Sequence, residues 1–473
     1  MAGPAVRKVL MNAGCRMPGS RDEPLADSVF LPPGRSADRR RRRDGWVIPG
    51  AAGSPVRGPI SWQQHTRLTY RQPLSNLDVL VDLPDGMETG HVARRLYDVA
   101  ARQAALRITQ VSLDAGGHTL FAPEPVIPLR HEVVDSDEEF HALVRDCAGR
   151  RFGQDGGPLW TATVVERPGP AGGRRRTLCG VFDHHVADGR SLDLFRAELT
   201  DALGSPSGPS TAGSYVDWLR WQHEQFPMGA RGRVTPASEF WRRYLDGSAP
   251  EWAPGFRFRT DEPLGKSYCR IRRKLFLSSE MLRRSAARSR VTPFILYLAA
   301  VASAISRHAE AEDVTVRTMT LGRPAPFLTT YGWMSSLVPV RVKGPGLADP
   351  VRAVPLAAAG WRQVLMWQAT PREYLRQLFA DGTGTTVAEQ PTVDLNFNPF
   401  PHAPRPTDSA PGTESCETVA KELPRMLLCM ELEADDHFSL ICMFPVERFP
   451  VADVRAFLDD LLAALAALLA GVE

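Results

Sequence analysis

Apolar and polar residues alternate in several parts of the N-terminal half of the chain. In residues 77–83 every second side chain is apolar and aspartates fall between them, which is typical of a half-buried strand. Apolar residues then recur at helical spacing in residues 92–103, and a further apolar stretch follows at residues 106–111. Residues 177–182 form a short apolar run before a second helical pattern in residues 192–203. The pattern therefore predicts strands and helices in alternation.

The C-terminal half begins with a strong helix signal. Thr292 and Pro293 have the character of an N-cap and a first-turn proline for a helix over residues 294–308, which is apolar on nearly all sides and should be buried. We expect strands around residues 314–320 and 337–342, and an amphipathic helix over residues 454–469. The segment 399–418 is rich in Pro, Ser and Thr without an apolar period, so it predicts a loop.

Composition suggests how the chain is divided. Residues 1–57 are rich in Gly, Pro, Arg and Ser and predict a disordered basic tail. A chain of 473 residues is long enough for two lobes. Breaks at residues 204–213 and 247–255 favour a boundary near residues 235–250, which gives an N-terminal lobe over 58–240 and a C-terminal lobe over 241–473.

Charge and cysteine content exclude several classes of protein. The 57 Lys and Arg nearly balance the 54 Asp and Glu. Five of the arginines lie together at residues 39–43, so the rest of the chain is close to neutral, which argues against a dedicated nucleic-acid surface. The seven cysteines form no CxxC pair, and Cys179 and Cys442 lie in apolar runs, as expected of buried thiols in a reducing compartment. We find no secretory signal and no apolar run of roughly 18 residues, so we expect a cytoplasmic protein without a membrane span.

Candidate chemistry is concentrated in FDHHVADGRS, residues 182–191, which we place in a loop between a strand and a helix. A neutral imidazole can take a proton from an attacking amine or hydroxyl near pH 7. Adjacent side chains at a strand end point to opposite sides, so only one of His184 and His185 should face a substrate while the other is structural. Both histidines being structural remains the alternative hypothesis.

Two residues after the histidines complete a possible acyl-transfer site. Asp188 can hold the loop through an ion pair or orient an imidazole, and Gly189 lets a backbone amide approach a developing oxyanion. Metal binding is disfavoured, because no other cluster of His, Cys and Asp at ligand spacing accompanies the motif. The GxSxG, GxxxxGK[ST] and HExxH strings of other enzyme classes are absent.

Several segments, in order, resemble the condensation-domain superfamily, the HHxxxDG acyltransferases of nonribosomal peptide synthesis with a chloramphenicol acetyltransferase-like fold. Aligning Asp188 and Gly189 on that motif places His184 at the catalytic histidine and Asp183 at the first histidine. Further segments resemble the SxAQ, RHExLR, YxDFAxWQ and GxFVNTLPLR motifs, and a strand is followed by GRP. These are residues 61–64 (SWQQ), 102–107 (RQAALR), 215–222 (YVDWLRWQ), 332–341 (GWMSSLVPVR) and 322–324.

The resemblance implies two related α/β lobes in a V-shaped pseudo-dimer, with a channel between them. An acyl or aminoacyl thioester would enter on the phosphopantetheine of a carrier protein in trans or of CoA, with no cofactor bound to the chain itself. A small-molecule amine or hydroxyl acceptor would enter from the other side. The resemblance makes His184 catalytic, pairs Asp188 with Arg107, and places Gly189 near the reacting carbonyl. Asp183 and His185 would then be structural supports.

Departures from the family motifs fall at Asp183, in place of the first histidine, at Arg190, in place of a tryptophan, and at Ser336, in place of an asparagine. We expect Arg190, Ser191, Ser336 and Tyr215 to lie along the substrate channel. These departures predict that the loop keeps its structure while the substrate differs from those of the family that the sequence resembles.

The sequence therefore predicts a free-standing condensation enzyme that forms an amide or ester bond in natural-product biosynthesis. One alternative is a lipid-directed acyltransferase, polyketide-associated or of the wax ester type, since Pro158, Leu159 and Trp160 resemble a string of the latter group. Another alternative is a non-catalytic docking platform, against which the retained His184, Asp188 and Gly189 count.

Overall fold

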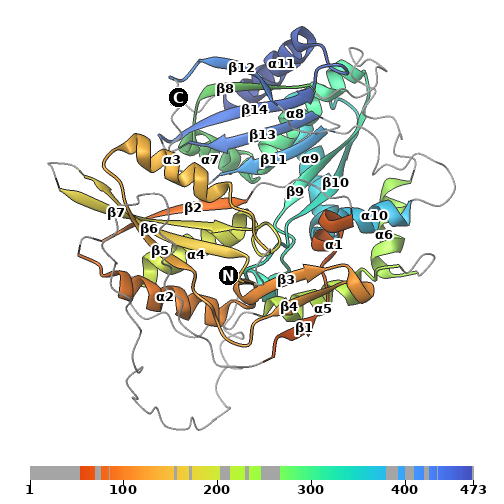
Figure 1. Cartoon of the computed structure of the whole chain (residues 1–473). Coiled ribbons are helices and arrows are strands. Elements are labelled where there is room, and N and C mark those ends of the chain that lie inside the picture. Colours follow the sequence, from red (N-terminus) through yellow and green to blue (C-terminus); the bar gives the residue numbers. More distant parts are fainter. Residues whose placement is uncertain are drawn as a thin grey trace, which may run out of the picture. The chain divides into compact units, whose positions relative to one another are not determined.

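A computed structural model describes residues 54–69, 76–84, 86–153, 157–169, 173–202, 213–229, 234–246, 267–379, 393–399, 410–419, 426–433 and 435–470 (Figure 1). Contacts divide the chain into residues 1–44 and 45–473, and every described residue belongs to the second unit. Most of the predicted tail, nearly all of the 204–213 break and the whole of the 247–255 break lie outside the described residues. A first strand already begins at Val56, inside the last residues of the predicted tail.

The described elements include both strands and helices along the whole described part of the chain (Figure 1). The strands are β1 (Val56–Gly58), β2 (Leu77–Leu83), β3 (Ile108–Ser112), β4 (His118–Phe121), β5 (Leu129–Val133), β6 (Trp160–Pro168), β7 (Arg174–Phe182), β8 (Tyr268–Ser278), β9 (Asp313–Thr320), β10 (Ser336–Lys343), β11 (Val393–Asn398), β12 (Glu414–Val419), β13 (Met426–Leu432) and β14 (His437–Pro445). The helices are α1 (Trp62–Thr69), α2 (Thr89–Arg102), the short 3₁₀ turn η1 (Ala104–Arg107), α3 (Asp137–Ala148), α4 (Gly189–Ala202), α5 (Tyr215–Gln225), α6 (Pro236–Leu245), α7 (Ser279–Arg288), α8 (Pro293–Ala309), α9 (Pro350–Val364), α10 (Arg372–Leu378) and α11 (Val451–Leu469).

A sheet of four strands in the order β2-β7-β6-β5 carries the histidine loop. Its strand β7 pairs antiparallel with both β2 and β6, so that Phe182 at its end lies opposite Leu77 and Trp160. Alternate β7 side chains enter different cores: Phe182 packs in the core that includes α2 and α4, while Val181 packs in the core that includes α3. The strand end that precedes the histidines is therefore fixed on both faces of the sheet.

A second sheet has the order β10-β9-β11-β13-β14-β8-β12, and a third small sheet has the order β1-β4-β3. Helix α8 lies in the core of the large sheet, where residues 295–306 are all buried, as its all-round apolar pattern predicts. Among the described residues no single helix is long and apolar enough to cross a membrane. Only α7 and α8, with an 84° bend between them, reach that length and apolarity together.

Several predicted elements are confirmed. Strand β2 coincides with the alternating segment, α8 begins at Pro293 after the N-cap Thr292, and α11 contains the C-terminal apolar stripe. The predicted lobe boundary falls inside α6, whose Trp241 packs in the core of the large sheet. The division into two lobes at residue 240 stays a prediction.

The loop predicted over residues 399–418 is wrong at its end, where β12 pairs antiparallel with β8. Strand β12 lies at the edge of the sheet and nearly all of its residues are exposed. Because neither face of this strand is buried, its sequence has no apolar period to reveal it.

The packing of α9 on β10 leads to a first prediction. A Cβ atom added at Gly360 of α9 would meet the backbone oxygen of Arg341 at 2.4 Å. We expect Gly360→Ala to lower the free energy of unfolding by about 1–3 kcal/mol, because backbone must shift to admit the methyl group. Gly90→Ala in α2 is the matched control, since its Cβ would meet nothing within 4 Å. Urea unfolding of both variants measures the difference, and equal stabilities would show that the close approach of α9 to β10 is not required.

Candidate active site

The FDHHVADG segment forms the connection from β7 to α4, as predicted from the sequence. Strand β7 ends at Phe182 and helix α4 begins at Gly189, and α4 packs beside β2. A side chain of α1 also holds this connection, because Gln64 Nε2 donates a hydrogen bond of 2.8 Å to the backbone oxygen of His185. Gln64 is completely buried and is fixed in turn by its hydrogen bonds with Ser61.

The His184 imidazole has no hydrogen bond to another described residue, and its Nδ1 is buried. Its ring lies against that of Trp333, with 4.5 Å between the ring centroids. Burial lowers the pKa of His184 below its ordinary value, against the opposing effects of its own backbone and the Asp188 carboxylate. The His184 ring is therefore neutral at pH 7 and able to accept a proton.

The neighbouring His185 is held in an ionic cluster. Its Nδ1 lies 2.8 Å from Asp183 Oδ1 and 3.1 Å from Arg67 Nη1, and its backbone amide donates to the same Asp183 oxygen at 2.8 Å. Arg67 of α1 contacts the same oxygen at 2.5 Å. Burial acts to raise the pKa of Asp183, but the hydrogen bonds from His185 and the charges of His185 and Arg67 outweigh it and hold the pKa below its ordinary value. The two adjacent histidines thus have different surroundings.

Asp188 is the most completely bonded residue of the connection. Arg323 donates to both carboxylate oxygens, at 2.8 Å to Oδ2 and 2.7 Å to Oδ1. Ser191 adds hydrogen bonds to Oδ1 from its backbone amide and its hydroxyl. The backbone amides of Met334 and Ser335 donate to Oδ2 at 3.1 and 2.9 Å. Every one of these contacts comes from α4 or from the segment between β9 and β10.

The charge of Asp188 is stabilised where it lies. Its side chain and that of Arg323 are 2% and 0% exposed, which places a full ion pair in the protein interior. Burial works to raise the pKa of Asp188, but the charge and the hydrogen bonds of Arg323 and the backbone amides hold it below the ordinary value. The carboxylate is therefore ionised and serves to hold the connection rather than to exchange protons.

The pairing of Asp188 with Arg107 is wrong. Arg107 Nη1 donates instead to the backbone oxygen of Pro123 at 3.0 Å, and its side chain lines a groove beside β1 and β4. The physical reason is that Arg323 and its neighbours already occupy both oxygens of Asp188. In the sequence Arg323 is the arginine of the GRP segment, for which no partner is predicted.

The structure also locates the remaining predicted site residues. Gly189 is exposed, and a Cβ atom added there would meet nothing within 4 Å, whereas Arg190 beside it is half-buried. Ser191, Ser336 and Tyr215 are buried: Ser191 belongs to the Asp188 cluster, and the Ser336 hydroxyl donates to the Thr370 backbone oxygen. The assignment of these four residues, Arg190 included, to a substrate channel stays a prediction.

Three residues near the histidines had no predicted role: Arg67, Trp333 and Arg323. Because a buried charge is normally paired, an ion pair between Asp188 and a basic residue could be expected from the sequence. Nothing local could select Arg323 for this position, since 135 residues separate the two. Trp333 likewise reaches His184 only through the fold. Among the described residues no group of three His, Cys, Asp or Glu side chains is placed to hold a metal ion.

The buried ion pair leads to a second prediction. We expect Asp188→Asn or Arg323→Met to lower the free energy of unfolding by about 3–5 kcal/mol, because each leaves its partner charged, buried and unpaired. The double variant should lose less than the sum of the two single losses. Arg284→Met is the control, since its ion pair with Glu280 is exposed and should contribute little. Urea unfolding measures these effects, and strictly additive losses would contradict a direct interaction.

A family model and several known proteins are similar to this chain. Residues 65–385 match the Condensation domain family. The phosphinothricin tripeptide synthetase PhsC of Streptomyces viridochromogenes is 26% identical over 314 residues, which cover 61% of this chain and 28% of that protein. The chain thus spans less than a third of that synthetase.

Solved structures show the same fold. The structure describing condensation domain-mediated chain release from the enacyloxin polyketide synthase has a TM-score of 0.67 and 22% identity, over 91% of this chain and 85% of that one. The starter condensation domain of rhizomide synthetase RzmA, solved as a mutant with C8-CoA, has a TM-score of 0.64 and 16% identity, over 88% and 96%. These likenesses confirm the predicted α/β fold. With the match over residues 65–385, which is more than half of its length, the chain belongs to the condensation domain family.

Proposed function

We propose that this chain transfers an acyl or aminoacyl group from a thioester to an amine or hydroxyl acceptor, with His184 as the general base. The observation that carries the proposal is the setting of the His184 ring, which is half-buried and has no hydrogen bond to another described residue. Burial lowers the pKa of this ring, which favours its neutral form. Membership of the condensation domain family supports the same reaction class.

In the proposed reaction the acceptor's N–H or O–H proton moves to His184 as the acceptor attacks the thioester carbonyl. The new carbon–nitrogen or carbon–oxygen bond forms, the carbon–sulfur bond breaks, and the leaving thiolate takes the proton back from the imidazolium. No metal or redox partner is needed for this balance. A base of this kind contributes roughly 10²–10⁴-fold to the rate, and positioning contributes more.

The oxyanion that develops on the carbonyl needs donors, and the start of α4 offers two. The backbone amides of Gly189 and Arg190 have no hydrogen-bond partner among the described residues, whereas the next amide, that of Ser191, is bonded to Asp188. These free amides lie at a helix N-terminus, where the partial charge is positive. The open space at Gly189 allows a substrate oxygen to approach them.

The donor is proposed to be a phosphopantetheine thioester, carried by a separate carrier protein or by CoA. The free-standing state, the acyl group and the acceptor stay predictions. A mass-spectrometric screen of carrier proteins and CoA loaded with different acyl groups, each offered amine and hydroxyl acceptors, identifies the pair used. Consumption of acyl-CoA with long-chain alcohols alone would instead support the lipid-directed alternative. Binding of carriers without any turnover would support the docking alternative.

A third prediction separates the two histidines. We expect His184→Gln to lower product formation by about 10²–10⁴-fold while leaving the melting temperature almost unchanged, because its ring forms no hydrogen bonds with described residues. His185→Gln is the matched control and should do the reverse, lowering the melting temperature through the loss of its bond to Asp183. Product formation by His184→Gln at the rate of the native chain would overturn the assignment.

A fourth prediction concerns pH. Because burial disfavours the imidazolium form, the neutral base persists to lower pH than for an exposed histidine. The acid limb of kcat/KM, measured with a hydroxyl acceptor that does not itself titrate, should therefore have its midpoint below 6.5, the ordinary histidine value. A midpoint above 6.5 would mean that the charged form of His184 is stabilised, contrary to the structure.

A further inference from the structure

A groove unrelated to the histidine loop lies beside the small β1-β4-β3 sheet. It has a volume of about 790 Å³, and its walls come from β1, β4, the segment after β4, Arg107 at the end of η1 and one face of α5. None of its lining residues belongs to the 182–191 connection. A volume in this range suits a small organic molecule and is far larger than an inorganic ion requires.

The charge of the groove is positive and incompletely neutralised. Arg107 donates to a backbone oxygen, and its Nε is buried without a hydrogen-bond partner. Arg57 Nη2 lies 3.1 Å from Nδ1 of His118, a ring nitrogen rather than a carboxylate. Within the described ranges neither arginine forms an ion pair with a carboxylate. Arg220, from the α5 wall, contacts Asp217 at 3.1 Å.

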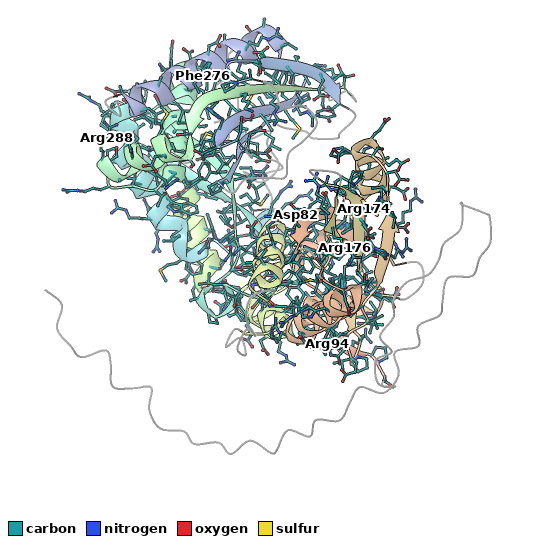
Figure 2. The ribbon with its side chains drawn as sticks, turned by 90° about the vertical axis from the view of Figure 1, so that its left-hand side faces the viewer. Asp82, Arg94, Arg174, Arg176, Phe276 and Arg288 are labelled. Carbon is teal, nitrogen blue, oxygen red and sulfur yellow. The ribbon has the colours of Figure 1, made fainter. Side chains whose placement is uncertain are left out.

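Elsewhere on the protein, clustered arginines do have carboxylate partners. Arg174 and Arg176 on β7, labelled in Figure 2, pair with Glu166 at 3.0 and 3.2 Å. Four other arginines of the described part also have a buried guanidinium atom without a hydrogen-bond partner: Arg167, Arg175, Arg317 and Arg372. Each of these four forms an ion pair with a carboxylate, whereas Arg107 forms none with a described residue. Buried charged donors without partners are costly, so such an arrangement points to a missing anionic partner.

The groove also presents apolar surface. Val56 of β1 is 59% exposed although it lines the groove, and Val216, one turn from Arg220 on α5, lies on the same wall. Phe121 of β4 is packed closely under Gly58, whose added Cβ would meet its ring at 2.8 Å. The binding surface therefore combines guanidinium donors with an apolar wall.

We propose that this groove binds a small phosphate ester with an apolar body, through Arg57 and Arg107 at the phosphate and Val56 and Val216 at the apolar part. Phosphate suits the site because paired guanidinium groups bind its oxygens through several charge-assisted hydrogen bonds. The apolar wall explains why an ester, rather than free phosphate, fits a groove of this size. The inference does not rest on acyl transfer, since the groove shares no residue with the His184 connection.

The test is calorimetric titration of the full chain with phenyl phosphate, inorganic phosphate and phenol. We expect one site for phenyl phosphate with at least about tenfold higher affinity than for either fragment, since both the charged and the apolar contacts contribute. Arg107→Met should weaken binding about tenfold or more, through loss of a charge-assisted contact. Arg57→Met should do the same, and because Arg57 is exposed this variant keeps the fold if Arg107→Met does not.

Arg94→Met is the matched control, because Arg94 is an exposed arginine on α2 outside the groove (Figure 2). Its affinity for phenyl phosphate should equal that of the native chain, and so should that of His184→Gln, which separates this proposal from the proposed catalytic role. Phenyl phosphate binding no tighter than inorganic phosphate, or binding unaffected by Arg57→Met, overturns the proposal.

Discussion

The buried ion pair between Asp188 and Arg323 is the interaction on which the candidate site depends. It joins the β7–α4 connection to the segment between β9 and β10, two parts of the chain that carry His184 and Trp333 respectively. The desolvation of both charges is offset because every oxygen of Asp188 has donors, including two backbone amides. Loss of either partner, or a shift of the backbone, would leave a buried charge unpaired. The ion pair therefore fixes the position of the connection that carries His184.

The two adjacent histidines have different neighbours in the fold. His185 donates to Asp183, whose negative charge is balanced by Arg67 of α1. His184 is packed against Trp333 and has no comparable partner, and its pKa is lowered. Asp183 stands where the resembled family motif has its first histidine. In this chain its carboxylate contacts the ring of His185. The departure from the motif is compensated by local electrostatics.

Local patterns were sufficient for much of the fold and for the position of the candidate site. The alternation in β2, the N-cap and proline of α8, and the strand-to-helix setting of the histidines all depend on residues close in sequence. Partners that are distant in the sequence could not be predicted in this way. An ion pair could be expected for Asp188, but the sequence alone does not distinguish Arg107 from Arg323 as its partner. Strand β12 was not predicted, because an edge strand that is exposed on both faces has no apolar period in its sequence.

The central claim is that the fold holds His184 as a neutral base. The most direct measurement is an NMR titration of the chain with ¹⁵N-labelled histidine, in which the His184 ring signals are assigned by their absence from His184→Gln. We expect a midpoint below 6.5, with the ring neutral at pH 7. A midpoint at or above 6.5 would show that the fold does not disfavour the imidazolium form of His184, contrary to the burial of the ring.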